Sequence, residues 1–376
     1  SIKNYLSKII RDYKFQLSSE NIDEFLEVKK DSFSKFSISK ISDFERNPYQ
    51  FFVKRVLGIA EERDIDIDNL VTGKFFHAVM SEKRIINFIA ECGSKFDIDV
   101  QKDEDIARRF NIKEILNDVI YSSDNKDILE TLKLIELLNT HKYILNNMIM
   151  RLEVAIAIEI KYFALTNFMP TFLERPFSLE IVDNVITCKN EETGEISKKE
   201  LQHKYNIPPI KFTGVIDRVD VNGKNISIID YKSSQSDFSL DSLELGFISQ
   251  ILTYALACEL MFDRNSEDIL GIFYREIAKL GKDLKSYRLR GVANSDLILD
   301  DEFYEKAPEI MYVRTTKAKK IHGADSHKAF TSPELEKLVN KNLENIMKLL
   351  EKIFEFNFSL DNYEIGNQYS AEKETL

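Results

Sequence analysis

Residues 211–234 read KFTGVIDRVDVNGKNISIIDYKSS, and this stretch carries the clearest structural pattern in the chain. Apolar and polar residues alternate on both sides of Asn222-Gly223. This pair favours the two-residue type I′ turn of a β-hairpin, because both residues tolerate a positive φ. A turn at these two residues predicts two antiparallel strands in which Asp217 lies opposite Ile228.

One face of this hairpin gathers three charged groups among aliphatic ones, because side chains along a strand alternate between its two faces. In this register Asp217 and Asp230 are diagonal neighbours, with Cα atoms roughly 7–8 Å apart. Burying like charges side by side is costly unless a cation neutralises them. The sequence therefore predicts a divalent-cation pocket at these two acids, with Lys232 reaching into it. The charged face carries Val215, Asp217, Val219, Ile226, Ile228, Asp230 and Lys232, and the other carries Arg218, Asp220, Ile229 and Tyr231.

The donor types in this pocket suit Mg²⁺ or Mn²⁺. These cations prefer carboxylate and carbonyl oxygens, and they keep open positions for water and a phosphate oxygen. Lys232 would position an attacking water or stabilise charge on the phosphate. A surface hairpin with solvated Asp217–Lys232 and Asp230–Arg218 pairs would produce the same short pattern. The residues alone leave both interpretations open.

The rest of the chain alternates between two apolar periods. Spacings of three and four predict an N-terminal helical segment over 1–60 and three to five helices over 71–165. A period of two predicts strands at 172–186 and 268–277, with a helix at about 240–262 before the second of them. From about residue 300 onward the pattern is helical again.

We expect these segments to form one composite α/β domain over 1–376, because no internal repeat, low-complexity tract or linker rich in Pro, Gly or Ser marks a boundary. Its core would lie at 170–290. A helical insertion at 71–165 and a helical C-terminal region at 300–376 would surround that core.

Composition narrows the class of protein. With 43% hydrophobic and 31% charged residues, and only 12 Gly and 7 Pro, the chain has the balance of a soluble folded protein. No apolar run approaches the roughly 18–20 residues that cross a bilayer, and no basic-then-apolar leader opens the chain. The first residue is Ser rather than Met, as in a piece of a longer protein, although processing or cloning leaves the same mark.

The cysteines indicate the redox compartment of the protein, and its net charge bears on how it would bind DNA. Cys92, Cys188 and Cys258 are far apart and odd in number, which favours a reducing, cytoplasmic setting. The net charge of −11 argues against strong non-specific coating of DNA, but not against a local basic track. Such a track lies within 314–328, where a solvated loop is an equally good explanation. Its members are Arg314, Lys317, Lys319, Lys320, His322, His327 and Lys328.

The hairpin motif resembles a known family. Gly214-x-x-Asp217-Arg218, followed by Ile229-Asp230-Tyr231-Lys232-Ser233, resembles the central motifs of the PD-(D/E)xK nuclease superfamily in its RecB-like branch. Four further pieces occur in the family's order, and together the six cover about residues 36 to 277. They are Ser37-x-Ser39 with Asn47-Pro48, Gly73-x-x-x-His77, Glu174 with Phe177, and Gln250-x-x-x-Tyr254.

The resemblance implies a restriction-endonuclease-like mixed central sheet flanked by helices, with a large helical insertion and a helical C-terminal region. It implies that His77 and the backbone carbonyl of Tyr231 are metal ligands beside the two aspartates, and that Glu174 is an additional acid. Gln250 and Tyr254 would contact the catalytic groups or the DNA backbone. Taken alone, His77 reads more simply as a packed or surface residue, and Gln250 and Tyr254 as ordinary helix residues.

Within the family, the chain most resembles the C-terminal nuclease domain of an AddB-type helicase–nuclease subunit, ahead of a free-standing RecB-like exonuclease. The expected activity is Mg²⁺-dependent, exonuclease-type hydrolysis of DNA, single-stranded or at a duplex end, in double-strand break repair and recombination. No G-x-x-x-x-G-K-[ST] motif occurs, so we expect no bound nucleotide. Unwinding would then come from an AddA-type helicase subunit or from the rest of a longer chain. The alternative is a catalytically silent, nuclease-like module that binds DNA or braces the same kind of complex.

One departure from the family concerns iron. Many RecB-like nucleases hold an iron–sulfur cluster through one early and three late cysteines. Here Asn47 precedes Pro48, where many relatives have Cys, and no cysteine follows Cys258. A four-thiolate cluster cannot be assembled from this set. We therefore expect no cluster, and we expect helix packing to close the N- and C-terminal ends.

Overall fold

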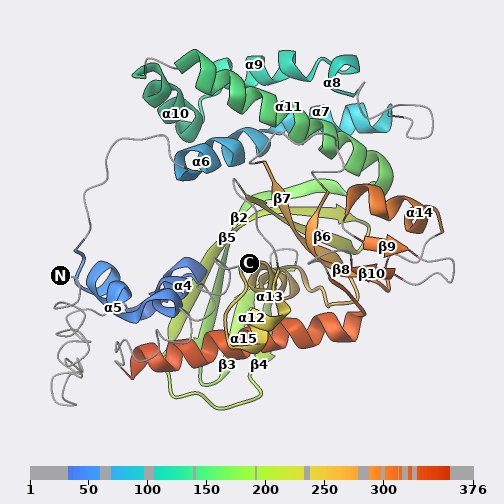
Figure 1. The fold of residues 1–376 in the computed structure, drawn as a ribbon. Coiled ribbons are helices and arrows are strands. Elements are labelled where there is room, and N and C mark those ends of the chain that lie inside the picture. Colours follow the sequence, from blue (N-terminus) through green and yellow to red (C-terminus); the bar gives the residue numbers. More distant parts are fainter. Residues whose placement is uncertain are drawn as a thin grey trace, which may run out of the picture.

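The computed structural model describes residues 33–59, 69–96, 106–138, 141–190, 193–232, 238–277, 288–297, 301–311, 313–315, 321–323 and 328–355. Within these residues the architecture is a mixed β-sheet with helices on both faces, as expected (Figure 1). None of the described helices has the length and apolar character needed to cross a membrane.

The sheet has nine described strands in the order β11-β8-β7-β6-β5-β2-β3-β4, with β1 pairing in parallel with β5. Pairs β6–β7 and β8–β11 are parallel, and the others along the path are antiparallel. A separate two-stranded ribbon joins β9 to β10. The strands are β1 Lys35–Phe36, β2 Met169–Val182, β3 Val185–Lys189, β4 Ile196–Glu200, β5 Ile210–Asn222, β6 Asn225–Lys232, β7 Ile269–Glu276, β8 Arg290–Asn294, β9 Val313–Thr315, β10 Ile321–Gly323 and β11 Lys328–Phe330.

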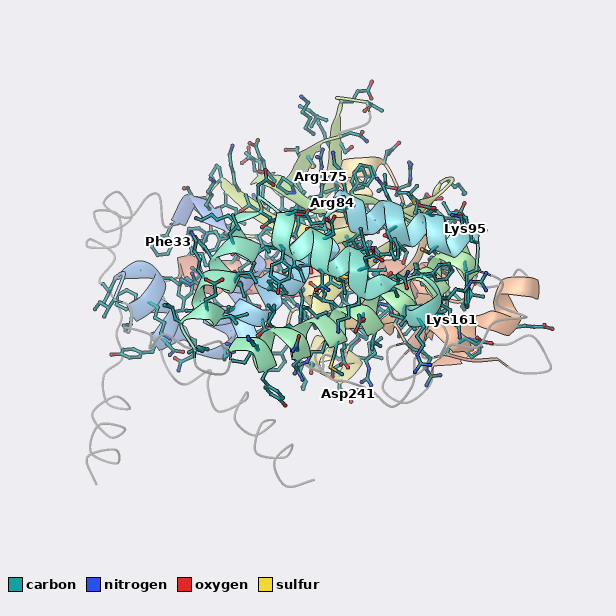
Figure 2. All side chains as sticks on the ribbon, turned by 90° about the horizontal axis from the view of Figure 1, so that it is seen from above. Phe33, Arg84, Lys95, Lys161, Arg175 and Asp241 are labelled. Carbon is teal, nitrogen blue, oxygen red and sulfur yellow. The ribbon has the colours of Figure 1, made fainter. Side chains whose placement is uncertain are left out.

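A layer of helices covers one face of the sheet at the top of Figure 1, and Figure 2 looks down on this layer. Its amphipathic members bury an apolar side, such as Ile85 and Ile89 of α7 and Leu116 of α9. These side chains share one core with Phe75 and with Tyr231 of β6. The layer consists of α6 Asn69–Met80, α7 Lys83–Ser94, α8 Ile106–Arg109, α9 Ile112–Ser122, α10 Lys126–Glu136 and α11 His141–Thr166.

A second core joins the other face of the sheet to the N- and C-terminal helices. The almost wholly apolar α13 is buried there along its length. The ring of Phe354 near the end of α15 lies 6.0 Å from that of Phe33 and 5.7 Å from that of Phe36, so aromatic packing closes the two ends of the described chain. Asn47 caps α5 by accepting from the amide of Gln50 at 2.9 Å. The helices on this side are α4 Ile38–Arg46, α5 Pro48–Phe51, the π-helix η1 Phe52–Val56, α12 Leu240–Glu244, α13 Gln250–Phe262 and α15 Ser332–Phe354. Helix α14 Asp301–Ile310 lies beside β9 and shares a third core with Tyr162 of α11.

The central hairpin forms, but its predicted turn is wrong by one residue and its predicted strand pairing by two. Asn222 pairs with Asn225, so the turn residues are Gly223 and Lys224. Gly223 has a φ of 62°, whereas Asn222 keeps a negative φ and stays in the strand. A turn with a positive φ only at its first residue is not type I′. The residues predicted for each face of the hairpin are unchanged. Each residue's partner shifts by two positions, and side chains alternate between the faces with a period of two.

The corrected register brings the two acids closer than predicted. Val219 pairs with Ile228 and Arg218 with Ile229, so Asp217 is not opposite Ile228. Continuing the ladder by one residue sets Asp217 directly opposite Asp230. Directly opposed side chains on one face of a sheet are closer than diagonal ones. The hairpin therefore places its carboxylates together more tightly than the sequence suggested.

Three other expectations need correction. The described residues of the helical insertion form six helices, α6 to α11, where three to five were expected over 71–165. The single helix expected at about 240–262 is two helices, α12 and α13, because the chain turns at Gly246 with a φ of 99°. The region after 300 is not helical throughout, since β9, β10 and β11 lie between α14 and α15. The predicted residues Lys317, Lys319, Lys320, His327 and Ser233, and most of the N-terminal segment, lie outside the described residues.

We predict that Gly291→Ala destabilises the fold far more than Gly194→Ala. Both glycines have a positive φ, 131° and 74°. A Cβ at Gly291 would lie 2.3 Å from the carbonyl oxygen of Ile272 on β7, whereas a Cβ at Gly194 would meet nothing within 4 Å. Denaturant unfolding should give a loss of about 3 kcal/mol for Gly291→Ala and about 1 kcal/mol for Gly194→Ala. Equal losses would contradict the close packing of β7 on β8.

Candidate metal centre

Four elements bring acidic and basic groups to the middle of β5 and the C-terminal end of β6. Asp217 and Asp230 come from these strands, Glu174 from the adjacent β2, and His77 from α6 in the helical layer. His77 Nδ1 lies 3.3 Å from Glu174 Oε1 and 3.5 Å from Asp217 Oδ2. One ligand atom from each of these three residues lies within 4.8 Å of the other two. Residues far apart in the sequence therefore meet in one cluster.

The backbone of Tyr231 completes the cluster. Its carbonyl oxygen lies 3.0 Å from His77 Nε2, and its N–H donates to Asp217 Oδ2 at 2.9 Å. The imidazole edge also contacts the Tyr231 ring, with centroids 5.7 Å apart. The carbonyl expected as a ligand thus lies beside the imidazole expected as another.

Burial makes this gathering of charge costly. Asp217 is 7% exposed and Asp230 1% exposed, so neither belongs to a solvated surface hairpin. Burial, together with the charge of Asp230, raises the pKa of Asp217 to about 7, although His77 opposes the rise. Burial also raises the pKa of Asp230, against the attraction of Lys232. The two acids therefore need a positive neighbour in order to stay ionised together.

The imidazole of His77 supplies part of that positive charge. Burial lowers its pKa, but the hydrogen bond to Glu174 and the charges of Asp217 and Glu174 outweigh burial and raise the pKa to about 9. Both ring nitrogens face oxygen acceptors, Nδ1 towards the carboxylates and Nε2 towards the carbonyl of Tyr231. Only the doubly protonated ring can donate at both positions. A proton on His77 thus occupies the place in the charge balance that a bound cation would take.

The donor set fits a hard divalent cation. Carboxylate oxygens gather at Nδ1 of His77 and the carbonyl oxygen of Tyr231 lies at Nε2, and oxygen donors beside an imidazole suit Mg²⁺ and Mn²⁺. Asp230 Oδ1 is buried with no hydrogen-bond partner among the described residues, an arrangement that usually marks an acceptor waiting for a ligand. His77, Glu174, Asp217, Asp230 and the Tyr231 carbonyl would hold the ion.

Lys232 lies next to Asp230 and begins a chain of hydrogen bonds. Its Nζ lies 2.6 Å from Asp230 Oδ2 and donates to Gln250 Oε1 at 2.8 Å. Gln250 Nε2 donates in turn to the hydroxyl of Tyr254 at 2.6 Å. Burial raises the pKa of Tyr254, so its hydroxyl stays neutral. All the predicted site side chains thus lie in one connected group, with Gln250 and Tyr254 orienting the lysine.

Glu174 reaches the cluster through an unusual backbone. It lies between Leu173, which pairs with Arg218, and Arg175, which pairs with Ile216, and therefore faces Asp217 across the ladder. Its φ is 46°, a value that non-glycine residues rarely adopt inside a strand. Such conformations persist where the surrounding structure imposes them, and they cluster at functional sites.

The opposite face of the hairpin holds a buried ionic network that the sequence reasoning missed. Glu159 of α11 accepts from Arg218 NH1 and from Arg275 Nε, both at 2.7 Å. Arg218 also binds both carboxylate oxygens of Asp220, at 2.5 and 2.6 Å. All four residues are at most 1% exposed. Glu159 lies within the otherwise apolar run VAIAIEI, and a lone acid in such a run was the available clue.

Opposite charges balance within this network. Burial alone would raise the pKa of Glu159, but the charges of Arg218 and Arg275 lower it below its ordinary value. Burial raises the pKa of Asp220 to about 6 despite Arg218, so this acid is ionised near neutral pH. Two cations therefore face two anions, as buried charges require.

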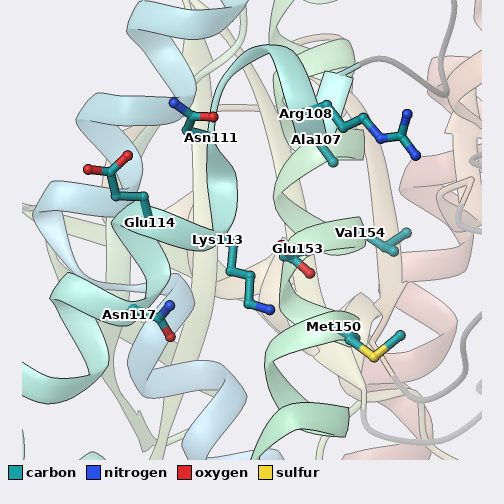
Figure 3. Close-up of a pocket in the computed structure, with 9 residues that line it drawn as sticks. All are labelled: Ala107, Arg108, Asn111, Lys113, Glu114, Asn117, Met150, Glu153 and Val154. Carbon is teal, nitrogen blue, oxygen red and sulfur yellow. The ribbon is translucent and has the colours of Figure 1, made fainter.

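A separate pocket opens on the helical layer between α8, α9 and α11 (Figure 3). Its lining contains none of the clustered residues, and we assign it no part in the site. The lining residues are Ala107, Arg108, Asn111, Lys113, Glu114, Asn117, Met150, Glu153 and Val154.

The chain is similar in sequence to known proteins. A family model described as the PD-(D/E)XK nuclease superfamily matches residues 35–364. The chain is 25% identical over 359 residues to a Thermoanaerobacter protein named as a subunit of an ATP-dependent helicase/deoxyribonuclease, covering 89% of this chain and 28% of that one. The protein of the same name from Limosilactobacillus reuteri is 24% identical over 363 residues, covering 88% of this chain and 27% of its own length. The chain thus spans less than a third of the length of these relatives.

We predict that Asp217→Asn stabilises the metal-free chain more at high pH than at low pH. The pKa of Asp217, about 7 in the folded chain, lies above its ordinary 3.8. A raised pKa contributes stability that is full below the ordinary value and is lost as the pH rises through the folded value. Asparagine mimics the protonated acid at every pH. Unfolding in EDTA should therefore show the variant gaining about 1 kcal/mol or more over wild type between about pH 5 and about pH 8.

The control for that experiment is Asp241→Asn, on an exposed position of α12. A gain for Asp217→Asn that is the same at both pH values would contradict the burial of like charges at Asp217 and Asp230.

Proposed function

The chain belongs to the PD-(D/E)XK nuclease superfamily, and from this we propose that it is a nuclease module that hydrolyses phosphodiester bonds of DNA with a bound Mg²⁺ or Mn²⁺. The observation that carries the proposal is the convergence of His77, Glu174 and Asp217 beside the buried Asp230, one oxygen of which has no hydrogen-bond partner among the described residues. A scaffold that had lost catalysis would have no reason to keep three carboxylates together at this cost.

Each residue of the cluster would have a role that follows from its position. A divalent cation bound here would neutralise the scissile phosphate and lower the pKa of an attacking water. His77, Asp217 and Asp230 would bind the cation, with the carbonyl of Tyr231 beside them. The side chain of Lys232 is 26% exposed, and its ammonium beside Asp230 would donate to a phosphate oxygen or to the water.

Gln250 keeps Lys232 in place. Its amide oxygen accepts from the ammonium, while its amide nitrogen donates to Tyr254, so a flipped amide would turn a donor towards the ammonium and lose that bond. The ammonium is thereby fixed between Asp230 and α13. A fixed donor stabilises developing charge without reorganising during the reaction.

The names of the relatives support a role for this chain within a larger complex. They are called subunits of a helicase/deoxyribonuclease, and we propose that this chain likewise works with a helicase, either an AddA-type subunit or the rest of a longer chain. In that setting it would cleave single strands or duplex ends in the cytoplasm during double-strand break repair and recombination. The exonuclease-type action is part of the same proposal.

We predict that Lys232→Ala and Asp230→Ala each reduce the cleavage of single-stranded DNA in Mg²⁺ or Mn²⁺ by about 100-fold or more, because each removes charge aimed at the reacting phosphate. Lys224→Ala is the matched control, since Lys224 lies in the turn of the same hairpin and is 72% exposed. It should cleave as wild type does.

All the chains should remain folded by circular dichroism, and EDTA should abolish cleavage by wild type. DNA binding without any cleavage by the wild-type chain, in both metals, would overturn the nuclease proposal and favour the binding module.

A further inference from the structure

Tyr231 joins the two faces of the central hairpin. Its main chain belongs to the cluster, through the carbonyl beside His77 Nε2 and the N–H donated to Asp217. Its side chain points the other way, under α11, where the hydroxyl accepts from Arg218 NH1 at 2.8 Å. The residue is 3% exposed. One residue is therefore held at both ends, by the cluster and by the ionic network.

The anchor behind the hydroxyl is rigid. Arg218 NH1 also donates to Glu159, and the rest of the guanidinium is fixed on both oxygens of Asp220. Glu159 is held by Arg275, which is the register partner of Tyr231 on β7. A guanidinium with partners on three sides cannot follow a moving hydroxyl, because its planar fork fixes the direction of every donor.

We propose that the Tyr231 hydroxyl, Arg218 and Glu159 form a positioning device that fixes the direction of the Tyr231 carbonyl and the separation of that carbonyl from His77. The inference rests on the proposed metal site. It assigns the helical layer a double part, because α6 contributes the imidazole and α11 contributes the buried acid that secures the carbonyl from behind. Partners behind metal ligands commonly set affinity in this way.

Simple core packing does not account for the arrangement. The ring of Tyr231 already fills its place in the apolar core of the helical layer, so a phenylalanine would pack there equally well. A hydroxyl deep in that core is costly without a partner, and a buried arginine supplies it. The nearby Tyr162 of α11 also buries a hydroxyl, but this one donates to Ser227 at 3.0 Å, whereas the hydroxyl of Tyr231 accepts from Arg218.

The pair of tyrosines provides the test. Tyr231→Phe removes one hydroxyl and keeps the ring and main chain, and Arg218 retains its bonds to Glu159 and Asp220. Tyr162→Phe is the matched control, since it removes a buried hydroxyl of the same kind beside the same network. Mn²⁺ binding to the 376-residue chain without DNA is measured by calorimetry, and cleavage is then titrated with Mn²⁺.

Tyr231→Phe should weaken Mn²⁺ binding by about 10-fold, as the loss of a partner behind a metal ligand typically does, and raise the half-saturating Mn²⁺ for cleavage to match. Excess metal should recover most of the lost rate. Tyr162→Phe should bind Mn²⁺ as wild type does, with a comparable loss of thermal stability. Equal Mn²⁺ affinity of Tyr231→Phe and wild type would overturn the positioning device and leave the proposed function standing. A wild-type chain that binds no Mn²⁺ would overturn both.

Discussion

Two carboxylates buried side by side, one in the middle of β5 and one near the C-terminal end of β6, are the constraint around which the site is built. Asp217 and Asp230 repel each other in a place where water cannot screen them, so positive charge must be brought to them. Lys232 is supplied locally by the same strand. His77 comes from α6, which packs on the sheet through the apolar core of the helical layer. The helical layer thus contributes one positive group to the two acids.

Both faces of the hairpin bury charged side chains, but the charges are compensated differently on each face. On the face under α11, two arginines and two acids neutralise each other completely, and every charge is fixed. On the other face acids exceed the fixed cations, and Asp230 keeps an oxygen without a hydrogen-bond partner in the part of the chain that the structure describes. A network whose charges balance stabilises the fold, whereas a cluster with excess negative charge attracts a cation. Tyr231 belongs to both, so the braced face supports the binding face through one residue.

Much of this was predictable from the sequence, and the limits have physical reasons. The hairpin, its two faces and its three charged groups follow from a period of two, which the one-residue error in the turn at Gly223 did not disturb. The place of His77 followed only from family motifs, because local periodicity says nothing about contacts between distant segments. The φ of Glu174 and the role of Glu159 escaped prediction, since both depend on what packs against them. Strands β9–β11 were missed because each has only three residues, too few to show a period.

The most direct test of the cation site is a crystal of this chain soaked in Mn²⁺, with the anomalous difference map calculated at the manganese edge. We expect one strong peak within coordination distance of His77, Asp217, Asp230 and the carbonyl of Tyr231. A map with no peak among these residues, or with manganese bound only to surface acids elsewhere, would contradict it.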